Sequence, residues 1–211
     1  PAMAALRQQF AACRLEVLGY PHIAQLAVAG RIADAIRSIE ARPVAGFFGR
    51  GMPLDAGWSN YFGQFALIVC YLYDPDGIFR ENVRRCSRAQ FVTGPHRPDE
   101  RVRLHASEAY LKPLEQLAIF GADPQPRLQL PEPAVEGGDR SALPEHGPAT
   151  WALHPGSGSE RKNWPEAHWA GFIEWLVRST NRRLLLLGGE AEGDRVRRLA
   201  GLVPPDRGAV A

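Results

Sequence analysis

The residues best suited to chemistry lie between two short apolar runs in the C-terminal third of the chain. The sequence HPGSGS at residues 154–159 is followed by the cations Arg161 and Lys162. Because glycine has no Cβ, backbone N–H groups in such a loop can approach an anion closely, and the serine hydroxyls and cations add donors and positive charge. The pattern favours a phosphate or diphosphate ligand. A solvated Gly/Ser loop with two surface cations is the alternative.

Two well-known phosphate-binding loops do not account for this sequence. A P-loop requires the pattern GxxxxGK followed by Ser or Thr, and the chain contains no such string. A dinucleotide-binding loop requires GxGxxG opening directly into a helix, whereas here Gly156 and Gly158 are followed by Arg161 at the third glycine position. The loop therefore belongs to neither type.

The elements around the loop form a predicted βαβα unit. Residues 150–153 are a short apolar strand, and Pro165 marks the start of a helix whose apolar residues recur at helical spacing over 169–177. Four leucines at 184–187 predict a central parallel strand covered on both faces, followed by a glycine turn and a second helix. Both loops of this unit lie at the carboxyl ends of strands, where open α/β sheets bind ligands.

Three pieces of this unit resemble the donor-side signature of glycosyltransferase family 9, the lipopolysaccharide heptosyltransferases and their relatives. They are the HPGSGS string, the segment Lys162-x-Trp164-Pro165, and the segment from Leu187 to Glu192 with the sequence LGGEAE. The resemblance implies an α/β enzyme of the GT-B type, with two Rossmann-like domains facing a cleft. It also implies that the C-terminal domain holds a nucleotide-diphosphate sugar.

The resemblance gives roles to individual residues. Lys162 is the expected catalytic residue, which stabilises the negative charge on the leaving diphosphate. The expected substrate-binding residues are Gly156, Ser157, Gly158, Ser159, Lys162, Gly189, Glu190 and Glu192. The implied donor is a nucleotide-diphosphate sugar, with ADP-heptose favoured, and the implied acceptor is a lipopolysaccharide-core or related glycan or glycolipid. No cofactor and no metal is expected, since the histidines and cysteines show no ligand spacing.

Residues 1–130 alternate between predicted helices and strands and resemble the acceptor-side Rossmann-like domain of the family. His96 and Arg97 follow a predicted strand at 89–92, where they could meet an anionic acceptor or remain solvated. His105 begins a predicted helix, a position at which histidine is more often a structural hydrogen-bonding residue than a catalyst. The aromatic- and glycine-rich segment 42–63 lies on the acceptor side in the family. Its other interpretation is an irregular surface segment with some buried aromatics.

Composition divides the chain into two domains and a linker, and the family pattern predicts what the chain lacks. Residues 131–148 are rich in proline and glycine and are expected to be an interdomain linker between the domain at 1–130 and a partial donor-binding domain at 149–211. The family has an opening strand and a Gly-x-Leu-Gly-Asp loop, whose Asp is the implied general base, ahead of the position of Pro1. It also has a later Gly-Asn-Asp-Ser-Gly-like loop. We therefore expect a chain truncated at both ends and without the base.

Composition narrows the partners and the compartment. The 211 residues carry a formal net charge of +2, which is too small to argue for nucleic acid. Three cysteines without paired spacing predict reduced thiols and a cytoplasmic protein. No apolar run approaches the roughly 20 residues of a membrane span, so any membrane contact, at the inner face of the cytoplasmic membrane, is expected to be peripheral.

Three other functions remain open at this stage. A GT-B enzyme using a UDP-sugar would keep the phosphate loop and change the nucleotide contacts. A non-hydrolysing sugar-nucleotide epimerase would share the architecture but would need its own acid and base carboxylates. The third is a non-catalytic binding or assembly module that keeps the family scaffold.

Overall fold

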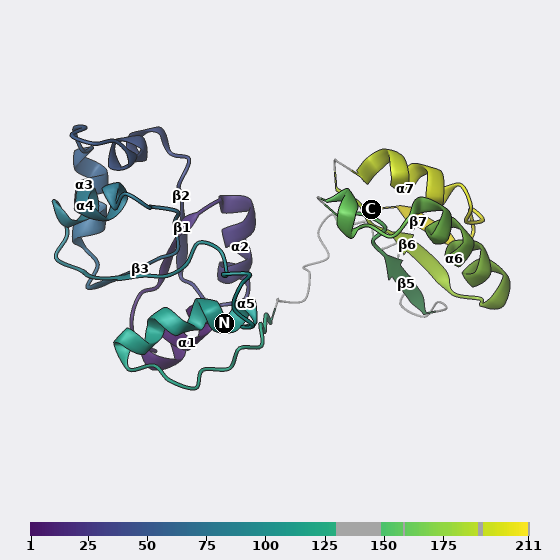
Figure 1. The fold of residues 1–211 in the computed structure, drawn as a ribbon, viewed down its shortest axis with the longest axis horizontal. Coiled ribbons are helices and arrows are strands. Elements are labelled where there is room, and N and C mark those ends of the chain that lie inside the picture. The colour runs from purple at the N-terminus through teal and green to yellow at the C-terminus, as the bar shows by residue number, and fades with distance from the viewer. Residues whose placement is uncertain (130–148, 158, 190–191, 211) are drawn as a thin grey trace. The chain divides into compact units, whose positions relative to one another are not determined.

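The computed structural model describes residues 1–129, 149–157, 159–189 and 192–210 (Figure 1). The chain consists of two compact units, Pro1–Ala134 and Val135–Ala211. The predicted linker at 131–148 lies outside the described residues.

The N-terminal unit alternates helices and strands as the sequence predicts. Its elements are α1 (Ala2–Gln9), β1 (Glu16–Gly19), α2 (Pro21–Ala29), β2 (Ala35–Ser38), the 3-10 helix η1 (Arg42–Phe48), α3 (Ala56–Gly63), β3 (Leu67–Cys70), α4 (Ile78–Arg84), β4 (Gln90–Thr93), α5 (Ala106–Leu111) and the 3-10 helix η2 (Lys112–Leu117).

The strands of this unit form two parallel pairs. β1 pairs with β2, with Glu16 opposite Ala35, and β3 pairs with β4, with Leu67 opposite Gln90. One apolar cluster serves both pairs, because Leu18 of β1 and Ile68 of β3 pack against the same buried core. Helical crossovers are what a parallel pair requires, so the element order and the pairing agree.

The core of the N-terminal unit corrects the interpretation of segment 42–63 as irregular. The segment forms η1 and α3, and its aromatic residues Phe47, Tyr61 and Phe62 are buried at the centre of the core. The carboxylate of Asp55 accepts the Trp58 N–H at 2.9 Å and caps α3. Burial of these large rings stabilises two helical segments that have no clear apolar period.

The C-terminal unit is a three-stranded parallel sheet with two α-helices. Its elements are β5 (Thr150–Leu153), the 3-10 helix η4 (Glu160–Lys162), α6 (Glu166–Ser179), β6 (Arg183–Leu186), α7 (Gly193–Ala200) and β7 (Gly208–Val210). The strand order is β5-β6-β7, so the leucine-rich β6 is central as predicted. β7 was not predicted from the sequence.

The sheet of the C-terminal unit is more deeply covered on one face than on the other. Leu184 and Leu186 of β6 are fully buried in a core that includes Ile173 and Leu176 of α6 and Leu199 of α7. The intervening leucine, Leu185, points to the opposite face and is half-buried. The expectation that the leucine run is covered on both faces is therefore wrong for the described part of the unit.

The end of α6 is held by an arginine from the C-terminal end of the unit. The guanidinium of Arg207 donates to the carbonyl of Val177 at 2.7 Å and also to the carbonyls of Thr180 and Arg182. A cation bonded to the terminal carbonyls stabilises a helix C-terminus. These bonds fix α6 relative to the lead into β6.

Helix length bears on membrane contact. The longest helix that the structure describes, α6, has 14 residues. Across the described ranges, none of the helices has the length and apolar character that crossing a bilayer requires.

The unequal covering of the sheet predicts different costs for neighbouring leucines. Leu186→Ala should lower the free energy of unfolding by about 2–5 kcal/mol, because it leaves a cavity at a fully buried site. Leu185→Ala, the matched control on the half-buried face, should cost less than half as much. Urea unfolding followed by tryptophan fluorescence measures both, since four of the five tryptophans lie in residues 149–211. Equal costs would contradict this account of the sheet.

Candidate functional site

Two loops meet at the carboxyl end of the C-terminal sheet. β5 and β6 are parallel neighbours, and their last residues, Leu153 and Leu186, are paired in register. The loop that follows β5 carries the HPGSGS sequence and η4, and the loop that follows β6 leads to α7. Because the two loops leave adjacent strands at the same edge, the predicted phosphate loop and the predicted LGGEAE segment lie together.

The contact between the loops depends on the small size of Gly156. This residue is buried, and a Cβ built on it would lie 2.2 Å from the Cγ of Glu192. No real Cβ makes such a contact, so a larger residue would force Glu192 to move. Gly188 is similarly restricted, since its Cβ would lie 2.5 Å from Cγ2 of Val196 on α7.

Glu192 also closes the second loop. Its carboxylate accepts the Gly189 N–H at 3.1 Å, and its own N–H donates to the Gly189 carbonyl at 3.1 Å. The side chain predicted to contact the donor therefore packs on the first loop and bonds to the second. Glu190 and Gly158, two of the predicted substrate-binding residues, lie outside the described residues.

Hydrogen bonds within the first loop set its shape. The Ser157 hydroxyl lies 2.8 Å from Oδ1 of Asn163 and 3.3 Å from the Ser159 carbonyl oxygen. The N–H of Lys162 donates to the Ser159 carbonyl at 2.9 Å, which begins η4. The Ser157 hydroxyl, predicted as a ligand donor, thus contacts other groups of its own loop.

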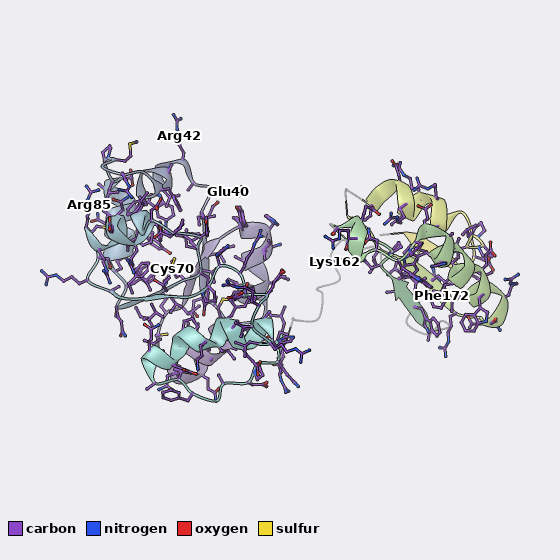
Figure 2. The ribbon with its side chains drawn as sticks, viewed as in Figure 1. Glu40, Arg42, Cys70, Arg85, Lys162 and Phe172 are labelled. Atoms are coloured by element: carbon purple, nitrogen blue, oxygen red, sulfur yellow. The ribbon has the colours of Figure 1, made fainter. Side chains whose placement is uncertain are left out.

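The charged side chains of the loop lie on its outer surface. Arg161 and Lys162 are exposed on η4, and Figure 2 shows Lys162 at one edge of the unit, away from Phe172 in the middle of α6. Glu160 and Glu166 bond to arginines of α7, Glu160 to Arg195 and Glu166 to Arg198. These guanidinium contacts hold the pKa of both carboxyls below the ordinary value, so both stay ionised at neutral pH.

The predicted site residues of the N-terminal unit lie at the carboxyl end of β4. His96 and Arg97 are exposed on the loop after this strand, and the His96 ring lies 4.5 Å from that of Tyr73. His105 caps α5, since its Nδ1 accepts the Ser107 N–H at 3.2 Å and Glu108 accepts the His105 N–H at 3.2 Å. This confirms the structural role predicted for His105.

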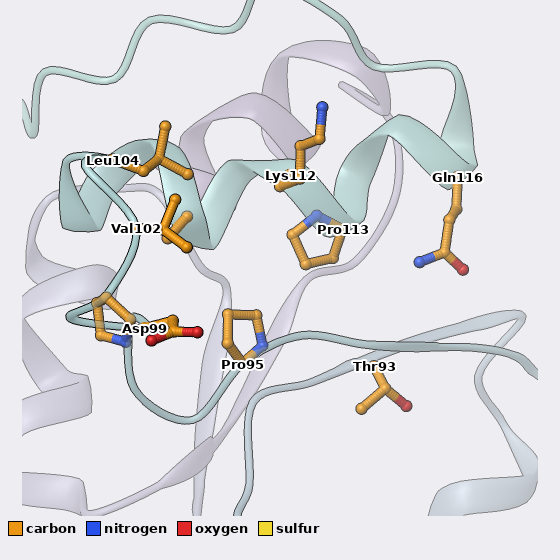
Figure 3. A pocket seen from close by; sticks show the side chains of 10 residues that line it. Thr93, Pro95, Asp99, Val102, Leu104, Lys112, Pro113 and Gln116 are labelled. Carbon is orange, nitrogen blue, oxygen red and sulfur yellow. The ribbon is translucent and has the colours of Figure 1, made fainter.

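A pocket opens beside that loop (Figure 3). It has a volume of about 370 Å³, and its wall is mostly apolar, with Pro95, Val102, Leu104 and Pro113 among the lining residues. Asp99 and Lys112 add one charge of each sign. His96 and Arg97 do not line the pocket, so the structure does not bring the predicted acceptor residues to it.

Sequence reasoning missed two residues of the phosphate loop region. Asn163 appeared only as the variable position between Lys162 and Trp164, yet it bonds to Ser157. Arg195 lies on the predicted second helix and was given no role, yet it bonds to Glu160 on η4. Spacing carried no signal for either contact. Within the described residues, no group of three or more His, Cys, Asp or Glu side chains has the arrangement of a metal site.

The arrangement of short parallel sheets flanked by helices matches the GT-B fold of glycosyltransferases. This confirms the predicted fold class. By sequence, no protein-family model and no curated protein matches the chain.

Solved structures of three bacterial proteins carry the match. A glycosyltransferase of family 9 from Veillonella parvula DSM 2008 aligns over 99% of this chain and 63% of its own, with a TM-score of 0.67 at 15% identity. The ADP-heptose lps heptosyltransferase II of E. coli aligns over 99% and 66%, with a TM-score of 0.63 at 12% identity. E. coli heptosyltransferase WaaC with ADP aligns over 100% and 69%, with a TM-score of 0.59 at 14% identity.

These matches confirm the predicted resemblance at the level of the fold. The chain spans 63% of the length of the first of these structures, and about two thirds of the others. The roles of individual residues remain predictions.

The tight contact at Gly156 predicts the effect of adding one methyl group. Gly156→Ala should lower the free energy of unfolding by about 1–3 kcal/mol, because the new Cβ overpacks the site against Glu192. Gly171→Ala is the matched control: it lies inside α6 with nothing within 4 Å of its Cβ position, and it should stabilise by about 0.5–1 kcal/mol. Urea unfolding measures both. A Gly156→Ala protein as stable as the unchanged chain would show that Glu192 moves freely.

Proposed function

We propose that this chain forms part of a glycosyltransferase that moves a sugar from a nucleotide-diphosphate donor to a glycan acceptor. Residues 149–211 supply the donor side and residues 1–130 the acceptor side. The observation that carries the proposal is the junction of the two loops at Gly156 and Glu192, with Lys162 on the adjoining η4. A backbone loop at the carboxyl end of a parallel sheet, with a cation beside it, is suited to a diphosphate.

The proposed chemistry follows from where charge develops. Transfer breaks the bond between the anomeric carbon of the sugar and the diphosphate oxygen, so negative charge builds on the leaving diphosphate. The N–H groups of the loop and the ammonium of Lys162 would stabilise that charge. One such contact, if it resembles an oxyanion-hole donor, lowers the barrier by about 2.7–4 kcal/mol.

The hydrogen bonds refine the roles of the neighbouring side chains. The Ser157 hydroxyl contacts Asn163 and Ser159, so we assign it to holding the loop and assign diphosphate binding to the loop's N–H groups. Glu192 bonds to Gly189 and packs on Gly156, so we assign it to joining the two loops beside the nucleotide.

ADP-heptose is the donor we favour, and a lipopolysaccharide-core sugar the acceptor. Two of the matching structures support an adenine nucleotide, since they are E. coli heptosyltransferase WaaC with ADP and with ADP-2-deoxy-2-fluoro heptose. We place the reaction in the cytoplasm, at the inner membrane face if the acceptor is a glycolipid. The free state of Cys13, Cys70 and Cys86 fits a reducing compartment.

Calorimetric titration with ADP, ADP-heptose and UDP-sugars tests this proposal. The chain should bind an adenine nucleotide more tightly than a UDP-sugar, and Lys162→Ala should weaken that binding about tenfold or more, because a charge-assisted contact to phosphate is lost. Arg178→Ala is the matched control, since Arg178 is an exposed cation in the last turn of α6. Its effect should be less than twofold.

The remaining outcomes separate the alternative functions. Tighter binding of a UDP-sugar would reassign the donor. Absence of binding by any nucleotide would contradict a donor site formed by these residues alone and would favour the non-catalytic module.

A further inference from the structure

Arg195 of α7 reaches the loop that carries Lys162. Its side chain is largely buried, with 17% of its surface exposed, and one terminal nitrogen of the guanidinium donates to both carboxylate oxygens of Glu160 at 3.1 and 3.0 Å. Glu160 is the first residue of η4, and Lys162 is the last. A single contact therefore joins the helix after the second loop to the segment that holds the cation of the first loop.

A neighbouring arginine of the same helix makes a different contact. Arg198 donates to the two oxygens of Glu166 at 2.7 and 2.8 Å, and Glu166 is the first residue of α6. Nε of Arg195 lies 3.6 Å from Oε2 of Glu166, an ion pair at a distance too long for a hydrogen bond, and within the described residues this buried Nε has no hydrogen-bond partner. Arg195 is thus hydrogen-bonded to the loop and ion-paired with the first residue of α6, whereas Arg198 contacts Glu166 of α6 and makes no contact with η4 among the bonds of the described residues.

We propose that Arg195 is a positioning residue for the diphosphate site: through Glu160 it holds η4, and with it Lys162, against α7. This inference rests on the proposed donor site. The guanidinium does not itself need to touch the ligand, because its donor nitrogen is directed at Glu160. In a loop proposed to bind an anion, a free carboxylate would oppose binding. The bond to Arg195 gives the carboxylate of Glu160 a structural role in that loop.

The two possible roles of Glu160 predict opposite effects of Glu160→Gln on the binding of an anion. If Glu160 is merely a negative charge two residues from Lys162, Glu160→Gln should tighten the binding of an anion. If Glu160 transmits the hold of Arg195, Glu160→Gln should loosen η4 and weaken binding. The second result is the one expected.

The test is a titration of the 211-residue chain with ADP by calorimetry, using Glu160→Gln, Arg195→Gln, the double variant and Arg198→Gln. Arg195→Gln and Glu160→Gln should each weaken ADP binding about fivefold, and the double variant should be no weaker than either one. Arg198→Gln removes the same charge from the same helix, so it should change binding by less than twofold.

A second readout does not depend on a ligand. Hydrogen exchange of the N–H groups of Lys162 and Asn163 should be faster in Arg195→Gln and unchanged in Arg198→Gln, because both groups bond within residues 159–163. If the unchanged chain fails to bind ADP, the donor site is wrong, and the exchange rates alone decide whether Arg195 holds the loop. Tighter binding in Glu160→Gln, equal effects of the two arginine variants, or unchanged exchange in Arg195→Gln would overturn the inference.

Discussion

The close approach of Gly156 to Glu192 is the constraint on which the rest of the candidate site depends. Parallel pairing of β5 with β6 brings two chain reversals to one edge, but pairing alone does not decide how near they come. The missing Cβ of Gly156 lets the side chain of Glu192 lie against the backbone, and the carboxylate then bonds to Gly189. The two loops form one surface because a single residue is small.

Hydrogen bonds around that surface hold the first loop in place. Ser157 and Asn163 shape the first loop from within, while Arg195 ties it to α7 from outside. Both contacts act on the short η4, so the position of its cation is set from two directions. In a site of this kind, backbone N–H groups held in one loop conformation bind the anion, and the charge of nearby side chains strengthens that binding.

The sequence predicted local features well and non-local ones poorly. β5 was predicted at its observed bounds, and the apolar stripe of α6 faces the core, because each pattern is complete within its own segment. β7 has only the residues Gly208–Val210, which carry no pattern, and its pairing is set by β6. The bonds of Asn163 and Arg195 likewise depend on which segments the fold brings together, a fact absent from residue type and spacing.

The aromatic segment 42–63 of the N-terminal unit is a second case in which contacts distant in sequence decide the structure. Its rings pack on one another, with Phe47 and Phe62 4.9 Å apart, so the helices there are stabilised by tertiary burial more than by a repeating pattern. Asp55 caps α3 in the structure, but it was assigned no role from the sequence, because no apolar period follows it to indicate a helix.

The paired strands of the N-terminal unit bear on how this chain behaves in solution. Within the described residues, each of its four strands has one neighbour, so each leaves a row of backbone donors and acceptors along its other edge. Such edges can recruit an extended segment from another molecule, and strands of four residues offer only a short template for it. If another molecule adds a strand to this chain, these edges of the N-terminal unit offer the backbone groups for it, far in sequence from the loops that define the candidate site.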